Sequence, residues 1–212
     1  VKSSSHPDPN KWYAQTTAKF TWDLPEDVTG VSVVLNQEPI DDPGPVADGL
    51  FSEKEYPNLE NVIHYLHIKF KDGRRWGTIE HFRIMVDTNP PKPFEAEVAA
   101  GEAGEWPVIE FETEDGESGL LKYEVYIGSL EKQAHEVEAG AGRLQVSELA
   151  VGEHIAIIKA VDKAGNERID TVSFRIDPIE TPLITNYPAT LKSSDRFYLN
   201  GTALAEVNVR IY

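Results

Sequence analysis

The sequence predicts an all-β chain of tandem antiparallel β-sandwiches joined by short proline-containing linkers. Two stretches, 64–84 and 154–176, share one pattern: an alternating strand, a polar turn and a second alternating strand. Alternation of apolar and polar residues is typical of a strand with one face in a core and the other in water. No segment has a helical period. A proline-bearing segment follows each stretch, so we expect similar β modules in succession.

The first module is expected at residues 1–89. Phe20 and Trp22 alternate with polar residues, so both side chains should point into a core. The same spacing places Leu66 and Ile68 on one face of a later strand. In chain order we expect a strand at 18–24, a turn at 25–30, a strand at 31–35, a loop at 39–49, and strands at 64–72 and 78–86.

The second module is expected at residues 90–178, and residues 179–212 form a partial third module. Roughly seven short strands separated by turn signals are what a sandwich requires. The third module has only about 34 residues, too few to complete such a core. The expected strands are 108–112, 123–127, 143–146, 156–160 and 172–176 in the second module, and 183–185, 196–199 and 207–209 in the third.

Two proline-bearing segments, 87–93 and 177–182, mark the module boundaries. Prolines cannot donate ladder hydrogen bonds and favour an extended conformation, so the first linker should be short and stiff. The chain begins at Val1 and ends in an alternating stretch at 205–212. We therefore expect it to be an internal piece of a longer parent protein.

Several segments resemble bacterial Ig-like and fibronectin type III-like repeats. These are the opening at 6–13, the exit at 87–91, the turn at 161–166 before a closing strand, and the start of the third module at 188–207. The resemblance implies Ig-like or fibronectin type III-like sandwiches in a cell-surface or secreted protein. Such modules act as spacers, stalks or adhesive units and sometimes accompany carbohydrate-active domains. The first module departs from the pattern at 72–76, where Asp-Gly-Arg-Arg-Trp replaces the usual turn.

The charge balance excludes two classes of partner. The chain has 36 acidic and 20 basic residues, for a formal net charge of −16, which repels nucleic acid phosphates and anionic membranes. No apolar run is long enough to insert in a bilayer. There are no cysteines, so no disulfide or thiolate metal site is possible. The absence of cysteine suits an exported bacterial or archaeal protein, so we expect an extracellular or cell-surface location. The acidity can also serve solubility alone.

The sequence predicts a chain without enzymatic activity. The sequence lacks a nucleophile elbow, a phosphate-binding glycine loop and paired histidines at helical spacing. His64 and His67 are three apart, which on a strand sends them to opposite faces, so they should not share a metal. The many carboxylates leave a glycosidase pair open, although small sandwiches rarely build the necessary cleft.

Calcium is the candidate cofactor, because clustered carboxylate and carbonyl oxygens on turns suit this hard cation. The candidate ligands are Asp115 with Glu117, on an acidic turn, Asp41 with Asp42 and Asp48, or Asp162 with Asn166, on a later turn. In the alternative reading, Asp162 and Asn166 shape a hairpin, since such side chains bond nearby backbone amides. A cation near Asp87, at the module junction, is a further option suggested by position alone.

Three aromatic residues are candidates for a sugar-binding platform. Trp12, Tyr13 and Trp76 lie outside the clear alternating strands, and exposed rings can stack on sugar faces. Alternatively, these rings cover the ends of the sandwich. Trp22 and Trp106 are expected to be core or junction residues.

The sequence therefore predicts a non-catalytic structural spacer or adhesive segment of an exported cell-surface multidomain protein. The alternative is a carbohydrate-binding module that accompanies a surface or secreted glycan-active protein. The expected partners are neighbouring domains of the parent chain, with a cell-surface glycan or protein as a further candidate.

Overall fold

The computed structural model describes residues 1–99, 106–178, 181–186, 188, 190, 196, 198 and 200–203, and its regular elements there are all β-strands. The strands are β1 (Lys2–Ser3), β2 (Trp12–Tyr13), β3 (Ala18–Thr21), β4 (Val28–Asn36), β5 (Glu53–Tyr56), β6 (Ile63–Asp72), β7 (Arg75–Trp76), β8 (Glu80–Val86), β9 (Glu97–Ala99), β10 (Val108–Glu110), β11 (Leu120–Ile127), β12 (His135–Glu138), β13 (Arg143–Gln145), β14 (Gly152–Asp162), β15 (Glu167–Ile176), β16 (Leu183–Asn186) and β17 (Asn200–Thr202). Within the described ranges, no helix has the length and apolarity that crossing a bilayer requires.

The first sandwich packs a three-stranded sheet, in the order β1-β3-β5, against a sheet in the order β2-β8-β6-β4, with β7 added to β6. The pairs are antiparallel except β2 with β8, which is parallel. Phe20 and Trp22 are buried as predicted, because the alternation of β3 sends them to the inner face. The core residues are Ala18, Phe20, Trp22, Val31, Leu66, Ile68 and Ile84.

The second sandwich has the same two-sheet arrangement. One sheet has the order β13-β10-β9 and the other the order β12-β11-β14-β15, all antiparallel. Its buried core residues are Ala96, Ile109, Phe111, Tyr123, Val125, Ile127, Val137, Val146, Ala156, Ile158, Ala160 and Phe174. The all-β fold of successive antiparallel sandwiches, predicted from the sequence, is therefore confirmed.

The two similar sequence stretches become corresponding hairpins. Strands β6 and β8 in the first sandwich, and β14 and β15 in the second, are antiparallel neighbours in the larger sheet. The turn that follows β6 contains Gly73 and the turn that follows β14 contains Gly165, and their φ angles of 53° and 92° lie in the left-handed region that favours glycine. The shared sequence pattern therefore specifies one shared piece of the fold.

Part of the outer face of the first sandwich is covered by a loop, the 37–50 loop. Ser32 and His67 on this face are fully buried, and Lys69 is 6% exposed. Ser32 donates from its hydroxyl to the carbonyl of Pro43 at 3.1 Å, and Lys69 pairs with Asp42. The alternation of β6 predicted a face in water, which is wrong for His67 and Lys69 because the loop packs over them.

After residue 178, β16 and β17 form an antiparallel hairpin. The predicted strand at 183–185 corresponds to β16. The predicted strand at 207–209 lies outside the described residues, as do Phe197 and Leu199 of the one predicted at 196–199.

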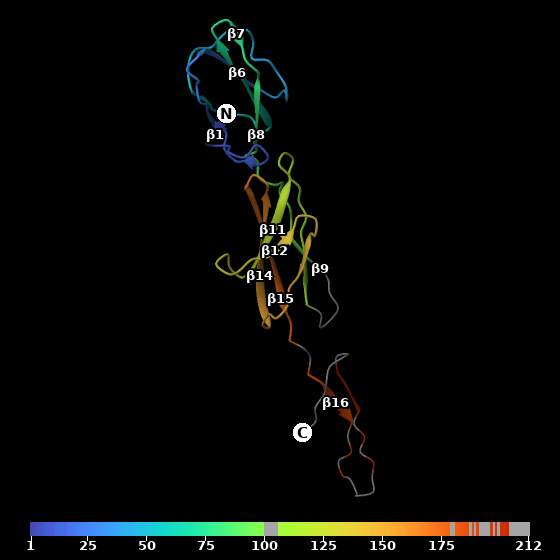
Figure 1. Cartoon of the computed structure of the whole chain (residues 1–212). Coiled ribbons are helices and arrows are strands. Elements are labelled where there is room, and N and C mark those ends of the chain that lie inside the picture. Colours follow the sequence, from blue (N-terminus) through green and yellow to red (C-terminus); the bar gives the residue numbers. More distant parts are fainter. Residues whose placement is uncertain are drawn as a thin grey trace.

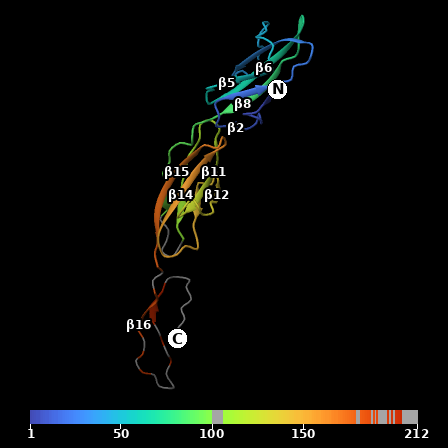
Figure 2. The same cartoon turned by 90° about the vertical axis from the view of Figure 1, so that its left-hand side faces the viewer.

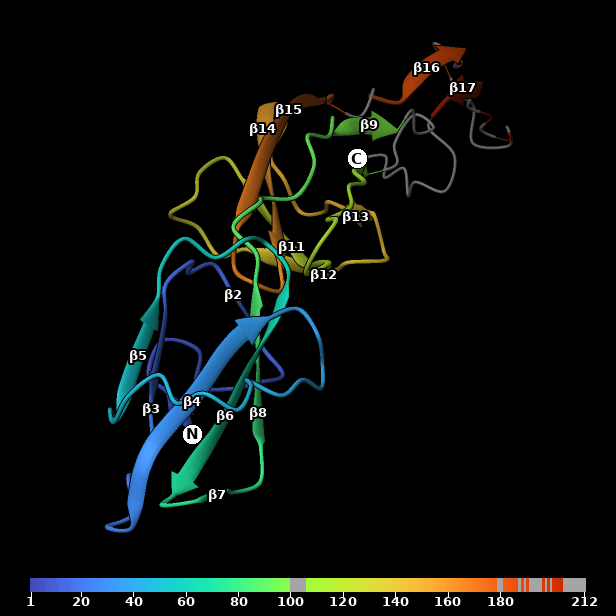
Figure 3. The same ribbon diagram turned by 90° about the horizontal axis from the view of Figure 1, so that it is seen from above.

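The two sandwiches lie end to end, with the short segment after β8 between them (Figures 1 and 2). Seen from above, the strands of the first sandwich form one body, and β11, β12, β14 and β15 lie in the other (Figure 3). The boundaries predicted at 89/90 and 178/179 stay predictions. This arrangement makes the segment between β8 and β9 the place where the two bodies meet.

Candidate functional site at the module junction

A buried carboxylate joins the two sandwiches. Asp87 follows β8 directly and is fully buried. One of its carboxylate oxygens accepts a hydrogen bond from the amide of Asn89 at 2.9 Å. The other accepts one from the amide of Ser118, in the second sandwich, at 3.1 Å. Because a buried charge is tolerated only when it is hydrogen-bonded, this carboxylate holds the first sandwich against the second.

The turn between β14 and β15 holds the linker backbone from the other side. The side-chain amide of Asn166 donates to the carbonyl of Asp87 at 3.0 Å and to that of Asn89 at 3.2 Å. The guanidinium of Arg168 donates to the carbonyl of Pro91 at 3.0 Å. The linker therefore presents the carbonyls of Asp87, Asn89 and Pro91 to the β14–β15 hairpin.

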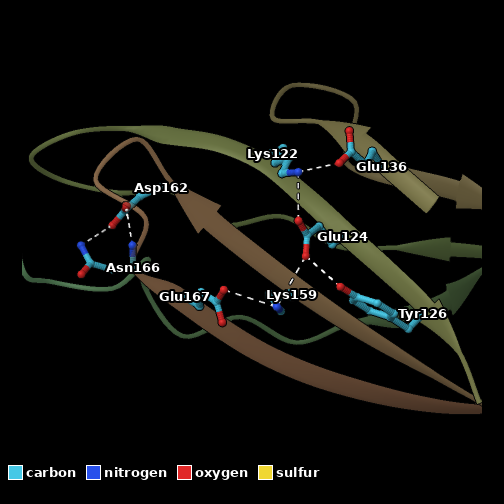
Figure 4. A network of polar contacts seen from close by, with 8 residues as sticks. All are labelled: Lys122, Glu124, Tyr126, Glu136, Lys159, Asp162, Asn166 and Glu167. Atoms are coloured by element: carbon cyan, nitrogen blue, oxygen red, sulfur yellow. Dashed lines mark hydrogen bonds and ion pairs between the residues drawn. The ribbon is translucent and has the colours of Figure 1, made fainter. Parts of the chain in front are cut away.

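The same turn accounts for two of the predicted calcium ligands. One Asp162 carboxylate oxygen accepts from the amides of Ala164 and Asn166, both at 2.8 Å, and the other accepts from the Asn166 side chain at 2.8 Å. Figure 4 shows Asp162 and Asn166 facing each other within the turn. Asp162 therefore satisfies the backbone of its own hairpin, as Asx side chains do in turns.

Two more of the predicted ligands lie beside Asp87. Asp115, Glu117 and Asp87 each place a carboxylate oxygen within 4.8 Å of the others. Asp115 also accepts from the amide of Gly119 at 2.7 Å, which closes the acidic turn. Glu117 accepts from the side chain of Asn89 at 3.3 Å. Carboxylates grouped this closely have the chemistry of a hard-cation site.

Asp87 was indicated in the sequence only by its position at a boundary. Its carboxylate is brought to Asp115 and Glu117 by contacts between residues about 30 positions apart, such as that with Ser118. No local motif records such a contact. Nearby, Lys92 forms an ion pair with Glu114 that lowers the pKa of Glu114 and raises that of Lys92; both side chains are exposed, so this pair adds little rigidity.

The three aromatic candidates do not form one platform. In the strand register, Trp12 on β2 lies opposite Met85 on β8, and Met85 lies opposite Ile63 on β6. Trp76 on β7 lies opposite Lys71 on β6. Ile63 and Lys71 are eight residues apart on β6, a separation of about 26 Å along an extended strand. Trp12 and Trp76 therefore lie near opposite ends of the sheet.

Two of these rings are also engaged within the first sandwich. Tyr13 packs edge-on against the ring of His6, and its hydroxyl accepts from the amide of Asp8 at 2.9 Å. The amino group of Lys69 lies 5.0 Å from the ring centre of Trp76. Trp22 is buried as expected, whereas Trp106 is 38% exposed and therefore is not a core residue.

The outer face of the second sandwich carries a ladder of ion pairs across its larger sheet (Figure 4). Lys122 pairs with Glu124 at 2.9 Å and with Glu136 at 2.6 Å. Lys159 pairs with Glu167 at 3.3 Å and with Glu124 at 3.5 Å. The ladder lowers the pKa of Glu124, chiefly through Lys122. Because each of these charged groups has an ion-pair partner, this part of the face offers few unpaired groups to a ligand.

Comparison with protein-family models finds no match, and comparison with curated protein sequences finds none either. Solved structures do resemble the chain. The fibronectin(III)-like modules of Clostridium thermocellum CbhA share 11% sequence identity with it at a TM-score of 0.46, covering 83% of this chain and 93% of that one. The FN1–FN3 domains of chicken CNTN1 share 12% identity at a TM-score of 0.38, covering 83% and 65%. A two-domain fibronectin type III segment of chicken tenascin shares 13% identity at a TM-score of 0.36, covering 82% and 97%.

Proposed function

We propose that this chain is a non-catalytic structural spacer or adhesive segment of an exported cell-surface multidomain protein. The observation that carries the proposal is the hydrogen-bonded junction. Three hydrogen bonds join the linker to the second sandwich, because Asp87 accepts from the amide of Ser118 and Asn166 donates to the carbonyls of Asp87 and Asn89. In a flexible connection, these linker groups would form hydrogen bonds with water instead. A junction built in this way fixes the direction of one sandwich relative to the next, as a spacer requires.

Calcium stays a prediction for this chain. The grouping of Asp115 and Glu117 with Asp87 supports it, because a divalent cation there would offset the repulsion among three carboxylates. Asp87 comes from the first sandwich side of the junction and the other two from the second. A cation at this position would therefore stiffen the connection and would serve the same spacer role.

The junction can be tested by residual dipolar couplings measured on the full chain in a dilute alignment medium. We expect the strands of both sandwiches to fit one alignment tensor. The variant Asn166→Ala removes the side-chain donor to the linker carbonyls and should give two different tensors. Gln133→Ala, an exposed change in the same sandwich, is the control and should behave as wild type. Two independent tensors in the wild-type chain would contradict the spacer proposal.

The alternative function, carbohydrate binding, has a separate test. A glycan array probed with the full chain should give no signal if the first sandwich is a spacer. Glycan binding that Trp76→Ala abolishes would support the carbohydrate-binding alternative and overturn the pure spacer role for this sandwich.

A further inference from the structure

Two histidines meet on the outer face of the first sandwich. His67 on β6 and His81 on β8 are directly opposite each other in the antiparallel pair. Their Nδ1 atoms lie 2.6 Å apart. His67 is fully buried beneath the 37–50 loop, whereas His81 is exposed. Two imidazole nitrogens therefore converge on one point that solvent can reach from the His81 side.

The proton positions follow from the neighbours of His67. The side-chain amide of Asn36 donates to Asp41 at 2.6 Å, and its oxygen accepts from the backbone amide of Glu38 at 3.0 Å. These two bonds orient the amide, so the Asn36 oxygen faces Nε2 of His67 at 3.0 Å. Nε2 must then carry the proton, and Nδ1 of His67 carries a lone pair. His81 donates to that lone pair from its own Nδ1.

We propose that His67 and His81 form a binding site for a divalent transition metal such as Zn²⁺, Ni²⁺ or Cu²⁺. The metal takes the place of the proton between the two Nδ1 atoms. The proton of His81 moves from Nδ1 to its Nε2 by exchange with water, so both neutral imidazoles present a lone pair. Water molecules complete the coordination on the exposed side.

The distance between the two nitrogens is compatible with this exchange. Two ligands bound to a tetrahedral Zn²⁺ at about 2.0–2.1 Å lie roughly 3.3 Å from each other. The pair is at 2.6 Å, so the rings must separate by about 0.7 Å. His81 can supply this movement because it is exposed. His67 is held in place by the loop and by Tyr65, whose ring stacks on it at 6.4 Å between centres.

The contacts made by Nε2 of His67 orient this ring as a metal ligand. Histidine ligands commonly donate their other ring N–H to a carbonyl or carboxylate, which fixes the ring and raises its basicity. Here Asn36 receives that proton and Asp41 holds Asn36. The cation of Lys69, two residues along β6, is neutralised by Asp42. The charge around the pair therefore does not oppose a bound cation.

The chemistry of this pair differs from that of the junction carboxylates. Imidazole ligands suit zinc, copper and nickel, whereas calcium requires oxygen ligands. The two sites should therefore respond to different metals. This inference is independent of the spacer function, since it rests on residues of the first sandwich alone.

Isothermal titration of the tag-free full chain with Zn²⁺ tests the proposal. We expect one zinc ion per chain and a Zn²⁺-dependent rise in the unfolding temperature. His81→Ala should weaken binding at least tenfold and should fold, since His81 is exposed. Asn36→Ala should weaken it by about tenfold through the loss of the contact with Nε2. His135→Ala, an exposed histidine of the second sandwich, is the matched control and should bind as wild type.

Electron paramagnetic resonance of the Cu²⁺-loaded chain tests whether both histidines are ligands, because a purely structural role of His81 would not change the spectrum of the bound metal. The wild-type spectrum should show hyperfine coupling to two imidazole nitrogens, and the His81→Ala spectrum should lose one. The proposal is overturned if neither Zn²⁺ nor Cu²⁺ binds at millimolar concentration, or if His81→Ala binds both as well as wild type.

Discussion

In the second sandwich, the hydroxyl of one buried side chain connects a strand to a turn. Tyr123 on β11 is fully buried, yet its hydroxyl accepts a hydrogen bond from the amide of Thr113 at 2.9 Å. The ring packs against Phe111 at 4.7 Å between centres. One side chain therefore contributes to the core and also satisfies a donor at the start of the acidic turn.

Replacing Tyr123 by Phe should destabilise the second sandwich by about 1 kcal/mol, because the amide of Thr113 loses its partner. Urea unfolding followed by the fluorescence of the tryptophans and by circular dichroism measures this loss. The control is Tyr126→Phe, on the same strand but on its outer face, where the hydroxyl donates to Glu124 at 2.9 Å. A larger effect at Tyr126 than at Tyr123 would contradict the assignment.

Some of these contacts can be read from the sequence and others cannot. The turn at Asp162, Gly165 and Asn166 is predictable, because aspartate, asparagine and glycine have strong local preferences there. The contact of Asn166 with the carbonyls of Asp87 and Asn89 spans 79 and 77 positions. It depends on how two bodies meet, so no local pattern of residues contains it.

At the scale of strands, the length of a strand determines whether its position can be predicted from the sequence. The long alternating strand β6 is predicted at nearly its observed position, because several residues repeat the same period, and the expected strand at 156–160 covers the middle of β14. The two-residue strands β1, β2 and β7 are too short to show any period. The covering of β6 by the 37–50 loop was also missed, since alternation cannot distinguish water from a polar loop.

The contact between β4 and the 37–50 loop depends on a small residue. A Cβ atom placed on Gly30 would lie 2.8 Å from the Cβ of Ala47. Gly30→Ala should therefore push the loop outward and destabilise the first sandwich by about 1–3 kcal/mol. Thermal unfolding of the full chain checks this, with Gly140→Ala as the control, because nothing lies within 4 Å of a Cβ there. Equal midpoints for the two variants would show that the loop does not pack as described.

At the scale of the whole molecule, charge gathers where the two bodies join. The chain has a net charge of −16. Three of its carboxylates, those of Asp87, Asp115 and Glu117, lie within 4.8 Å of one another at the junction. Sequence alone identified Asp115 and Glu117 as an acidic pair. The sequence could not place Asp87 with them, since that requires the relative position of two sandwiches.

Calcium should raise the unfolding temperature of the full chain by about 4 °C or more at saturating concentration. Asp115→Ala combined with Glu117→Ala should abolish the rise. The control is Glu110→Ala with Glu112→Ala, which removes the same charge from the same sandwich at another place. Asp162→Ala is a poor probe, because loss of its backbone contacts would destabilise the turn with or without calcium. An unchanged midpoint in the wild-type chain would exclude the calcium prediction.

The hydrogen-bonded linker has a mechanical consequence. A pulling force applied along the molecule passes through the backbone between Asp87 and Pro91, where each side-chain contact can break separately. The β14–β15 ladder, by contrast, joins ten residue pairs that must yield together. The junction should therefore open at a lower force than either sandwich and close again when the load falls. The chain would act as a rod with a reversible joint that protects its folded bodies from rupture.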